Sequence, residues 1–185
     1  IISSMNSTDI APSRLQRAKY KTLDILHQIK EGQTGMLVFS SSAFVVSPLT
    51  SDTNTIASMI PILDSSIVPV QGSDIGKALQ KSGQLLSQAG YTQGQIILIT
   101  DSTPDYFAIS EAKKLSSQGY SISILAIGSN QNAPTINASG VYATDANGNE
   151  VSILKDRKTT QLNPLAYMYN QGQLGYMNPN NSTPS

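Results

Sequence analysis

The run Ile96-Ile-Leu-Ile-Thr100, followed directly by Asp101, limits the possible folds of this chain more than any other feature. A continuous apolar run of this length is typical of a strand buried on both faces, as in a parallel sheet covered by helices. A helical pattern over residues 106–118 and a second apolar run over residues 121–127 complete a βαβ unit. The sequence therefore predicts an α/β fold with a doubly wound, mostly parallel sheet flanked by helices.

The first half of the chain shows the same alternation. Apolar residues at helical spacing predict a first helix, which Ser13 or Asp9 caps and Glu31-Gly32 ends. The apolar positions of this helix are Leu15, Ala18, Thr22, Ile25, Leu26 and Ile29. Further elements are expected as strands at residues 36–39 and 43–46, and as helices at residues 53–63 and directly after Gly72-Ser-Asp74.

After Gly128 the composition changes to Asn, Gln, Gly and Ser. One edge strand is expected near residues 140–143, a tight turn at residues 145–149 and a last short helix at residues 164–169. We expect a single domain over residues 1–177, with its core in residues 1–128, a looser part in residues 129–177 and a polar tail at residues 178–185.

Bulk composition excludes several classes of function. Twelve basic and twelve acidic residues cancel, so nothing indicates binding to nucleic acid. The absence of cysteine excludes disulfides, thiolate catalysis and zinc-thiolate sites. No apolar run has the length of a membrane span. The start at Ile1, without Met, predicts that the chain is an excerpt of a longer protein.

Two polar clusters lie where such a sheet presents a ligand site. Ser73 and Asp74 open an amphipathic helix, and Asp101 ends the long apolar strand. Carboxylate and hydroxyl oxygens that meet at the carboxyl edge of a parallel sheet suit a hard divalent cation. This pattern favours a metal-dependent binding module over an enzyme.

Several motifs carry a resemblance to a known family. They are Ser4-Met-Asn-Ser-Thr-Asp-Ile10, Pro12-Ser-Arg-Leu15, Phe44-Val-Val-Ser-Pro-Leu-Thr-Ser-Asp52, Val68-Pro-Val-Gln-Gly-Ser-Asp-Ile-Gly76 and Ile99-Thr-Asp101. The chain resembles the von Willebrand factor A (VWA) domain, and within it the bacterial aerotolerance BatA/BatB type. The resemblance implies a metal-ion-dependent adhesion site for Mg²⁺ or Mn²⁺, to which Ser4, Ser73 and Asp101 correspond, with Asp105 as a peripheral candidate.

The chain departs from the family pattern at three places. Ile2 stands where the first Ser of the Asp-x-Ser-x-Ser loop is expected, and the leading Asp would fall just before Ile1. Ser102 replaces the usual Gly of the third loop. The strand before the first loop, central in this fold, is largely missing from the chain. We therefore expect an incomplete metal site. The missing strand either belongs to the parent protein and is absent from this chain, or another segment fills its place.

The resemblance also implies a cellular setting. Such proteins are associated with the bacterial inner membrane through segments that would lie outside this chain, and their soluble domain is expected in the periplasm. The implied partners are a MoxR-type AAA+ ATPase or sibling VWA and TPR proteins. The resemblance implies a protein-interaction module with no catalytic role.

Two other functions stay open from the sequence. The chain could be a metal-independent scaffold with a degenerate site, or, less in keeping with its motifs, a phosphotransfer enzyme or hydrolase that uses Asp101. An enzyme lacks support because His27 is the one histidine and has no nucleophile near it in sequence.

Structural roles also explain several of these residues. Ser73 and Asp74 can act as helix caps, as can Asp105 before Tyr106. Asp9 is expected to stabilise the first loop. A solvated helix face accounts for the basic cluster of Arg14, Arg17, Lys19 and Lys21.

Overall fold

A computed structural model describes residues 3–102, 104–128, 133–134 and 152–153 of this chain. The expected edge strand near residues 140–143, the turn at 145–149, the helix at 164–169 and the polar tail lie outside the described residues. The helices are α1 (Arg14–Gln28), α2 (Thr53–Met59), α3 (Ile75–Gln88) and α4 (Tyr106–Ser117), with short 3-10 turns η1 (Ser3–Asn6) and η2 (Ser65–Ile67). The strands are β1 (Thr34–Phe39), β2 (Ala43–Thr50), β3 (Gly94–Thr100), β4 (Tyr120–Ala126), β5 (Ala133–Pro134) and β6 (Ser152–Ile153).

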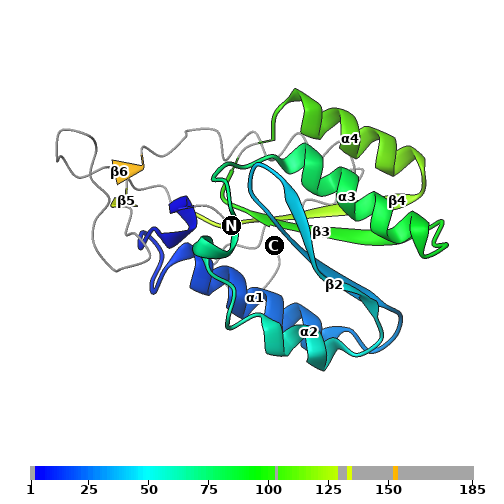
Figure 1. The fold of residues 1–185 in the computed structure, drawn as a ribbon, viewed down its shortest axis with the longest axis horizontal. Coiled ribbons are helices and arrows are strands. Elements are labelled where there is room, and N and C mark those ends of the chain that lie inside the picture. The colour runs from blue at the N-terminus through cyan, green and yellow to red at the C-terminus, as the bar shows by residue number, and fades with distance from the viewer. Residues whose placement is uncertain (1–2, 103, 129–132, 135–151, 154–185) are drawn as a thin grey trace, which may run out of the picture.

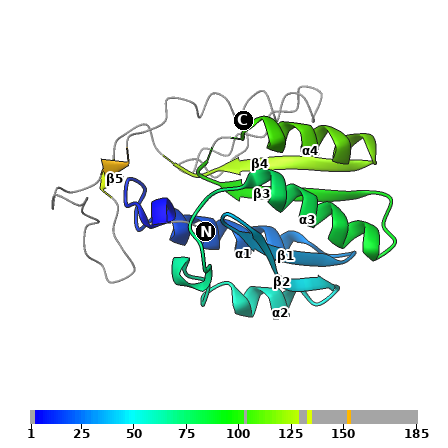
Figure 2. The ribbon, with the colours of Figure 1, turned by 45° about the horizontal axis from the view of Figure 1, so that its top comes forward.

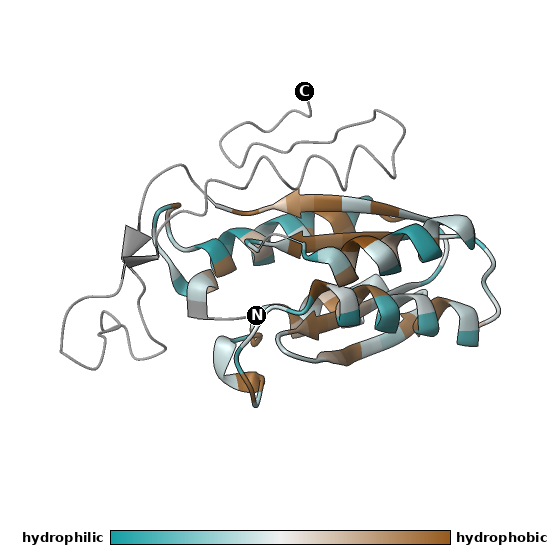
Figure 3. Cartoon of the chain, turned by 90° about the horizontal axis from the view of Figure 1, so that it is seen from above, coloured by the Kyte–Doolittle hydropathy of each residue, from teal (hydrophilic) through white to brown (hydrophobic). Residues whose placement is uncertain are grey.

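The four longer strands lie between two layers of helices, with α3 and α4 on one face and α1 and α2 on the other (Figure 1). Figure 3 shows the apolar character of β3 and β4 beside helices that carry both polar and apolar residues. This arrangement confirms the predicted α/β fold with helices on both faces of the sheet.

The strands form separate pairs. β3 and β4 are parallel and in unbroken register from Gly94 opposite Tyr120 to Thr100 opposite Ala126. β1 and β2 are an antiparallel hairpin, and β5 pairs with β6. Among the described residues no strand lies between β1 and β3, which Figure 2 shows as members of two distinct pairs. The expectation of a largely missing central strand agrees with this gap.

Two element boundaries differ from the sequence prediction for reasons that involve proline. β2 continues to Thr50 and includes Pro48, beyond the expected end of this strand at residue 46. A strand that pairs on one edge tolerates proline, because the missing N–H can face away from the ladder. α2 ends at Met59 and not at residue 63, since Pro61 removes a donor and disfavours helix in the residue before it.

Among the residues that the structure describes, the buried apolar side chains fall into three separate clusters. The largest joins α3, α4, β3 and β4 around Leu79, Leu98 and Ile122. A second joins η1 and the start of α1 to the ends of β3 and β4, and a third joins the end of α1 to α2 and β1. A domain of this size normally has one contiguous core, so this division marks a place where packing is interrupted.

Candidate functional site

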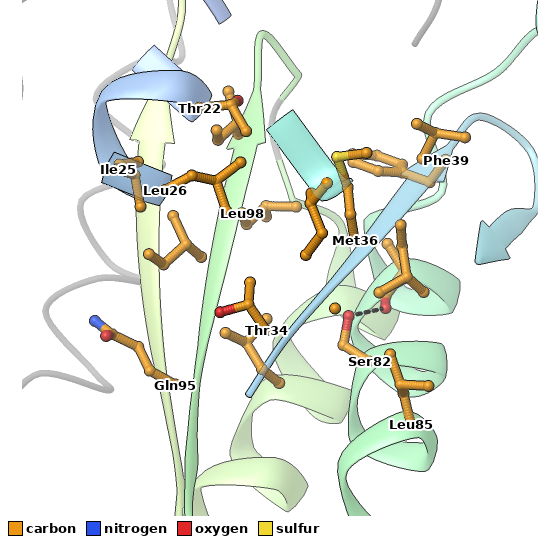
Figure 4. Close-up of a pocket in the computed structure, with 18 of the residues that line it drawn as sticks. Thr22, Ile25, Leu26, Thr34, Met36, Phe39, Ser82, Leu85, Gln95 and Leu98 are labelled. Atoms are coloured by element: carbon orange, nitrogen blue, oxygen red, sulfur yellow. Dashed lines mark hydrogen bonds between the residues drawn. The ribbon is translucent and has the colours of Figure 1, made fainter. Parts of the chain in front are cut away.

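The loops at the carboxyl ends of β1 and β3 lie together, and we call them, with η1 and the residues leading to α1, the loop edge. It comprises residues 3–9, 40–42, 71–74 and 101–102. Figure 4 shows that β1 and β3 run in the same direction, from Thr34 to Phe39 and from Gln95 to Leu98. Ser40 and Asp101, which follow these strands, are therefore at the same edge of the sheet, as the sequence pattern predicted for Asp101.

Two hydrogen bonds to the turn between β1 and β2 fix the loop that carries Ser73. The backbone N–H of Asp74 donates to the carbonyl of Ser40 at 2.7 Å, and the Nζ of Lys77 donates to the carbonyl of Ser41 at 2.9 Å. Gly72 has a φ of +152°, and a Cβ placed there would lie 3.0 Å from the Cβ of Ser41. Only glycine fits both the conformation and the close approach, so Gly72 sets the path of this loop.

A buried ion-pair network lies behind the loop edge. Arg14 Nε and Nη2 donate to the two carboxylate oxygens of Asp9 at 2.8 and 2.9 Å, and Arg14 Nη1 donates to Asp101 Oδ2 at 2.9 Å. The side chains of Arg14, Asp9 and Asp101 are only 7%, 0% and 4% exposed. One guanidinium therefore joins the first loop, α1 and the end of β3.

The surroundings of Arg14 favour the charged form of its guanidinium. Burial, the largest single influence, acts to lower the pKa of Arg14, but the hydrogen bonds and charges of Asp9 and Asp101 outweigh it and raise the pKa above its ordinary value. The bidentate contact with Asp9 also matches the planar geometry of the guanidinium.

The expectation that Arg14 belongs to a solvated basic face is wrong, because this side chain is buried and paired. A pattern in the sequence predicts that Arg14 is buried. Arg14 precedes Ala18 by one helical turn, so it lies on the apolar face of α1 and not on the polar face. An arginine on an apolar helix face needs a buried carboxylate partner, and Asp9 and Asp101 provide it.

The structure separates the roles of Ser73 and Asp74. Asp74 is the N-cap of α3 and accepts a hydrogen bond from the N–H of Lys77 at 2.8 Å. Ser73 is exposed and lines the same cavity as Asp101. The capping role that the sequence predicted for both residues therefore falls to Asp74, and Ser73 is exposed at the loop edge.

Ser4 lies in η1, and its Oγ is buried without a hydrogen-bond partner among the described residues. Buried hydroxyls are normally bonded, so this atom is of the kind that accepts a ligand. Asp105 has the structural role that we weighed for it: it caps α4 by accepting from the N–H of Ala108 at 2.8 Å. His27 is exposed in the last turn of α1.

These residues do not fit a complete divalent-cation site. Within the described part of the chain, no three His, Cys, Asp or Glu side chains come together. The two carboxylates behind the loop edge, Asp9 and Asp101, already share one guanidinium. The hydroxyls of Ser4 and Ser73 are suitable oxygen donors, but a hard cation also needs carboxylate charge that a fixed arginine does not neutralise. The assignment of Ser4, Ser73 and Asp101 as metal ligands stays a prediction.

Comparison with known proteins identifies the family. A family model described as the von Willebrand factor type A domain matches residues 3–103, more than half of the chain. This range contains Ser4, Ser73 and Asp101 as well as Arg14 and Asp9. No curated protein matches the chain.

Two solved structures from Bacteroides are similar over most of the chain. One is an aerotolerance-related membrane protein of Bacteroides fragilis with multiple mutations to serines, at 28% identity and a TM-score of 0.79, covering 91% of this chain and 84% of that one. The other is BatB of Bacteroides thetaiotaomicron, at 27% identity and a TM-score of 0.78, covering 90% and 82%.

A more distant structure shares the fold alone. The manganese-loaded TRAP protein of Plasmodium vivax has 17% identity and a TM-score of 0.56, and the match covers 89% of this chain and 69% of that one. None of the helices in the described part of this chain has the length and apolar character of a membrane span. With a family model over more than half of its residues and Bat-type structures along most of its length, this chain belongs to the von Willebrand factor type A domain family.

Proposed function

We propose that this chain is a protein-interaction module that binds its partner through the loop edge. The observation that carries the proposal is the buried bridge of Asp9, Arg14 and Asp101, which holds three separate segments in one arrangement. A surface held in place before binding loses little conformational freedom when a partner docks. The exposed hydroxyl of Ser73 and the partnerless hydroxyl of Ser4 supply polar contacts at this surface.

In this chain the positive charge of Arg14 already pairs with the carboxylates of Asp9 and Asp101. Partner binding is therefore expected to proceed without metal, as in the scaffold function that the sequence left open. The metal-dependent form of the module, which the family resemblance implies, would use Ser4, Ser73 and Asp101 as ligands of Mg²⁺ or Mn²⁺ and needs further carboxylate charge.

An enzymatic role for Asp101 has little support. A carboxylate that acts as a nucleophile needs access to its substrate, but the side chain of Asp101 is 4% exposed and is bonded to Arg14. Within the described residues Asp101 belongs to no group of three His, Cys, Asp or Glu side chains. We therefore propose an adhesion-type role and not catalysis.

The partner and the cellular place are proposed from the family resemblance. We infer a MoxR-type AAA+ ATPase or a sibling VWA or TPR protein as the partner, and a periplasmic position at the bacterial inner membrane. The likeness to a Bacteroides fragilis protein described as an aerotolerance-related membrane protein supports this setting.

Binding of the purified chain to the MoxR-type ATPase and the sibling proteins of its source organism tests the proposal. Ser73→Arg places a bulky cation on the loop edge and is expected to weaken binding at least about tenfold, since an unmatched interfacial charge opposes docking. Ser51→Arg is the matched control: Ser51 is also exposed and follows Thr50, which pairs with Thr34 at the opposite edge. Equal affinities of both variants, or no binding of the unaltered chain to any of these proteins, would refute the proposal.

A further inference from the structure

A cavity of about 470 Å³ lies between α3 and α4, at the opposite ends of the strands from the loop edge. Its lining includes Thr92, just before β3, and Tyr120, the first residue of β4, whereas Asp101 follows the other end of β3. Figure 2 shows α3 and α4 side by side, and each ends where the chain turns back into the next strand. We call this cavity the helix-end pocket, and it shares no residue with the loop edge.

Contacts within the chain hold the walls of the helix-end pocket in place. The Oη of Tyr120 donates to the carbonyl of Tyr91 at 2.6 Å, and Tyr120 is only 5% exposed. The N–H of Tyr91 donates to the carbonyl of Leu86 at 3.1 Å, which ties this loop to the end of α3. On the facing wall, Gly83 lets α4 approach, because a Cβ there would meet the side chain of Leu115. A preformed pocket of this kind loses little freedom when a ligand binds.

A nearly buried carboxylate, that of Glu111, lines the helix-end pocket. Glu111 is 8% exposed, and its Oε2 pairs at 3.3 Å with the Nζ of Lys114 on the same helix. The side chain of Lys114 is 55% exposed, so this ion pair is largely in contact with solvent and contributes little. Buried carboxylates require a cationic partner. Glu111 would therefore gain from a cation that the pocket itself encloses.

The rest of the lining also favours positive charge. α3 and α4 both end beside the pocket, and the C-terminal end of a helix carries partial negative charge. Gln80 and Gln84 add side-chain amides, whose carbonyl oxygens accept hydrogen bonds from a cation. Tyr91 lines the pocket and is 39% exposed, and the face of such a ring attracts an ammonium or guanidinium group.

The same lining limits the class of ligand. A hard divalent cation needs several carboxylates, and within the described part of the chain no three His, Cys, Asp or Glu side chains come together. An anion would be repelled by Glu111 and by the two helix ends. A neutral ligand would give the carboxylate of Glu111 no charged partner. An organic cation satisfies all of these conditions.

From these observations we propose that the helix-end pocket binds an organic cation whose primary ammonium or guanidinium group pairs with the carboxylate of Glu111. The bound group replaces the Nζ of Lys114, which turns into solvent. The same chemical group is present in free amines and in the Lys and Arg side chains of proteins, so either source can supply the ligand. This site stands independently of the partner proposed for the loop edge.

Titration of the isotope-labelled 185-residue chain, followed by NMR, tests the proposal. The probes are putrescine and the peptide acetyl-Gly-Arg-Gly-amide, and the neutral control is butanediol. We expect the backbone amide signals of Glu111 and Gln118 to shift and to saturate with a Kd of about 1 mM or tighter for at least one cation. Binding of putrescine alone assigns the site to a free amine, and binding of the peptide alone assigns it to a basic side chain of another protein. No saturation with either cation, or equal shifts with butanediol, would overturn the proposal.

Three variants assign the binding to Glu111. Glu111→Gln keeps the shape of the side chain but removes its charge, and it should weaken binding at least about tenfold. Lys114→Met removes the cation that the ligand must replace and should tighten binding about threefold. Lys113→Met loses the same charge at an exposed position outside the pocket lining, so the affinity should not change. Equal affinities of Glu111→Gln and the unaltered chain, or weaker binding by Lys114→Met, would overturn the proposal.

Discussion

At the scale of single residues, Arg14 determines how the loop edge is held. Its guanidinium is shared by Asp9 and Asp101, and all three side chains are almost fully buried. A buried charge that loses its partner is strongly destabilising, although the intact network adds little stability compared with apolar residues of the same size. The sequence placed Asp101 at the loop edge but did not reveal this pairing, because Asp101 is 87 positions from Arg14. A contact over that distance depends on the fold and not on local spacing.

Arg14→Met leaves two carboxylates buried without their cation. We expect the free energy of unfolding to fall by about 3–5 kcal/mol. Arg17→Met is the matched control on the same helix, where the side chain makes one exposed hydrogen bond to the carbonyl of Ala11. The control should lose about 1 kcal/mol or less. Urea unfolding of both variants measures the difference, and similar losses would argue against the network.

The stability of the fold at acid pH depends in part on a carboxylate that caps a helix, that of Asp64. The pKa of Asp64 is lowered below its ordinary 3.8, chiefly because its carboxylate accepts a hydrogen bond from the N–H of Ser66. A group with a lowered folded-state pKa stabilises the fold above its unfolded value and loses this contribution as pH falls through the folded value.

Asp64→Asn should therefore lose less stability than the unaltered chain between about pH 5 and about pH 2. Asp24→Asn is the comparison, because the Asp24 side chain is 61% exposed and its carboxylate lies 3.8 Å from the Nζ of Lys21. Thermal unfolding across this pH range gives the slopes. A parallel decline in the Asp64 variant and the unaltered chain would show that Asp64 does not contribute.

At the scale of elements, local patterns predicted the existence and type of every main helix and strand up to Ala126. N-caps were readable because Ser13, Asp74 and Asp105 carry the short oxygen side chains that a helix start needs. The length of β2 could not be predicted from the sequence. Proline normally ends a strand, and Pro48 is tolerated within β2 because the described part of this strand pairs with β1 along one edge.

The packing of α3 on α4 depends on two glycines that lie on one face of α3. A Cβ at Gly76 would meet the ring of Phe107, and a Cβ at Gly83 would meet the side chain of Leu115. Leu115 is only 3% exposed and has little room to move, whereas Phe107 is 41% exposed and can rotate outward. The two glycines therefore differ in how closely they limit the helix spacing.

Gly83→Ala should destabilise the fold by about 1–3 kcal/mol through overpacking, despite the better helix propensity of alanine. Gly76→Ala should cost less, because Phe107 can give way. Gln84→Ala, at an exposed position of the same helix, controls for propensity. Chemical denaturation of the three variants ranks them, and a stabilised Gly83→Ala chain would contradict this packing account.

At the scale of the whole molecule, the described strands form separate pairs and the described core residues form three clusters. The sequence predicted the α/β architecture because periodicity is local, and it indicated the interrupted sheet through the resemblance to the VWA family. It did not indicate that Arg14 neutralises the carboxylates of Asp9 and Asp101, because this pairing depends on the fold. The ligand roles of Ser4, Ser73 and Asp101 remain predictions.

Titration calorimetry with Mn²⁺ tests most directly whether the loop edge is an adhesion site that lacks one carboxylate. The 185-residue chain should bind Mn²⁺ with a Kd weaker than about 1 mM. A chain preceded by an apolar strand segment that ends in Asp should bind more tightly, and Asp101→Asn should abolish this gain. Tight binding by the 185-residue chain alone, or no gain in the extended chain, would contradict the account.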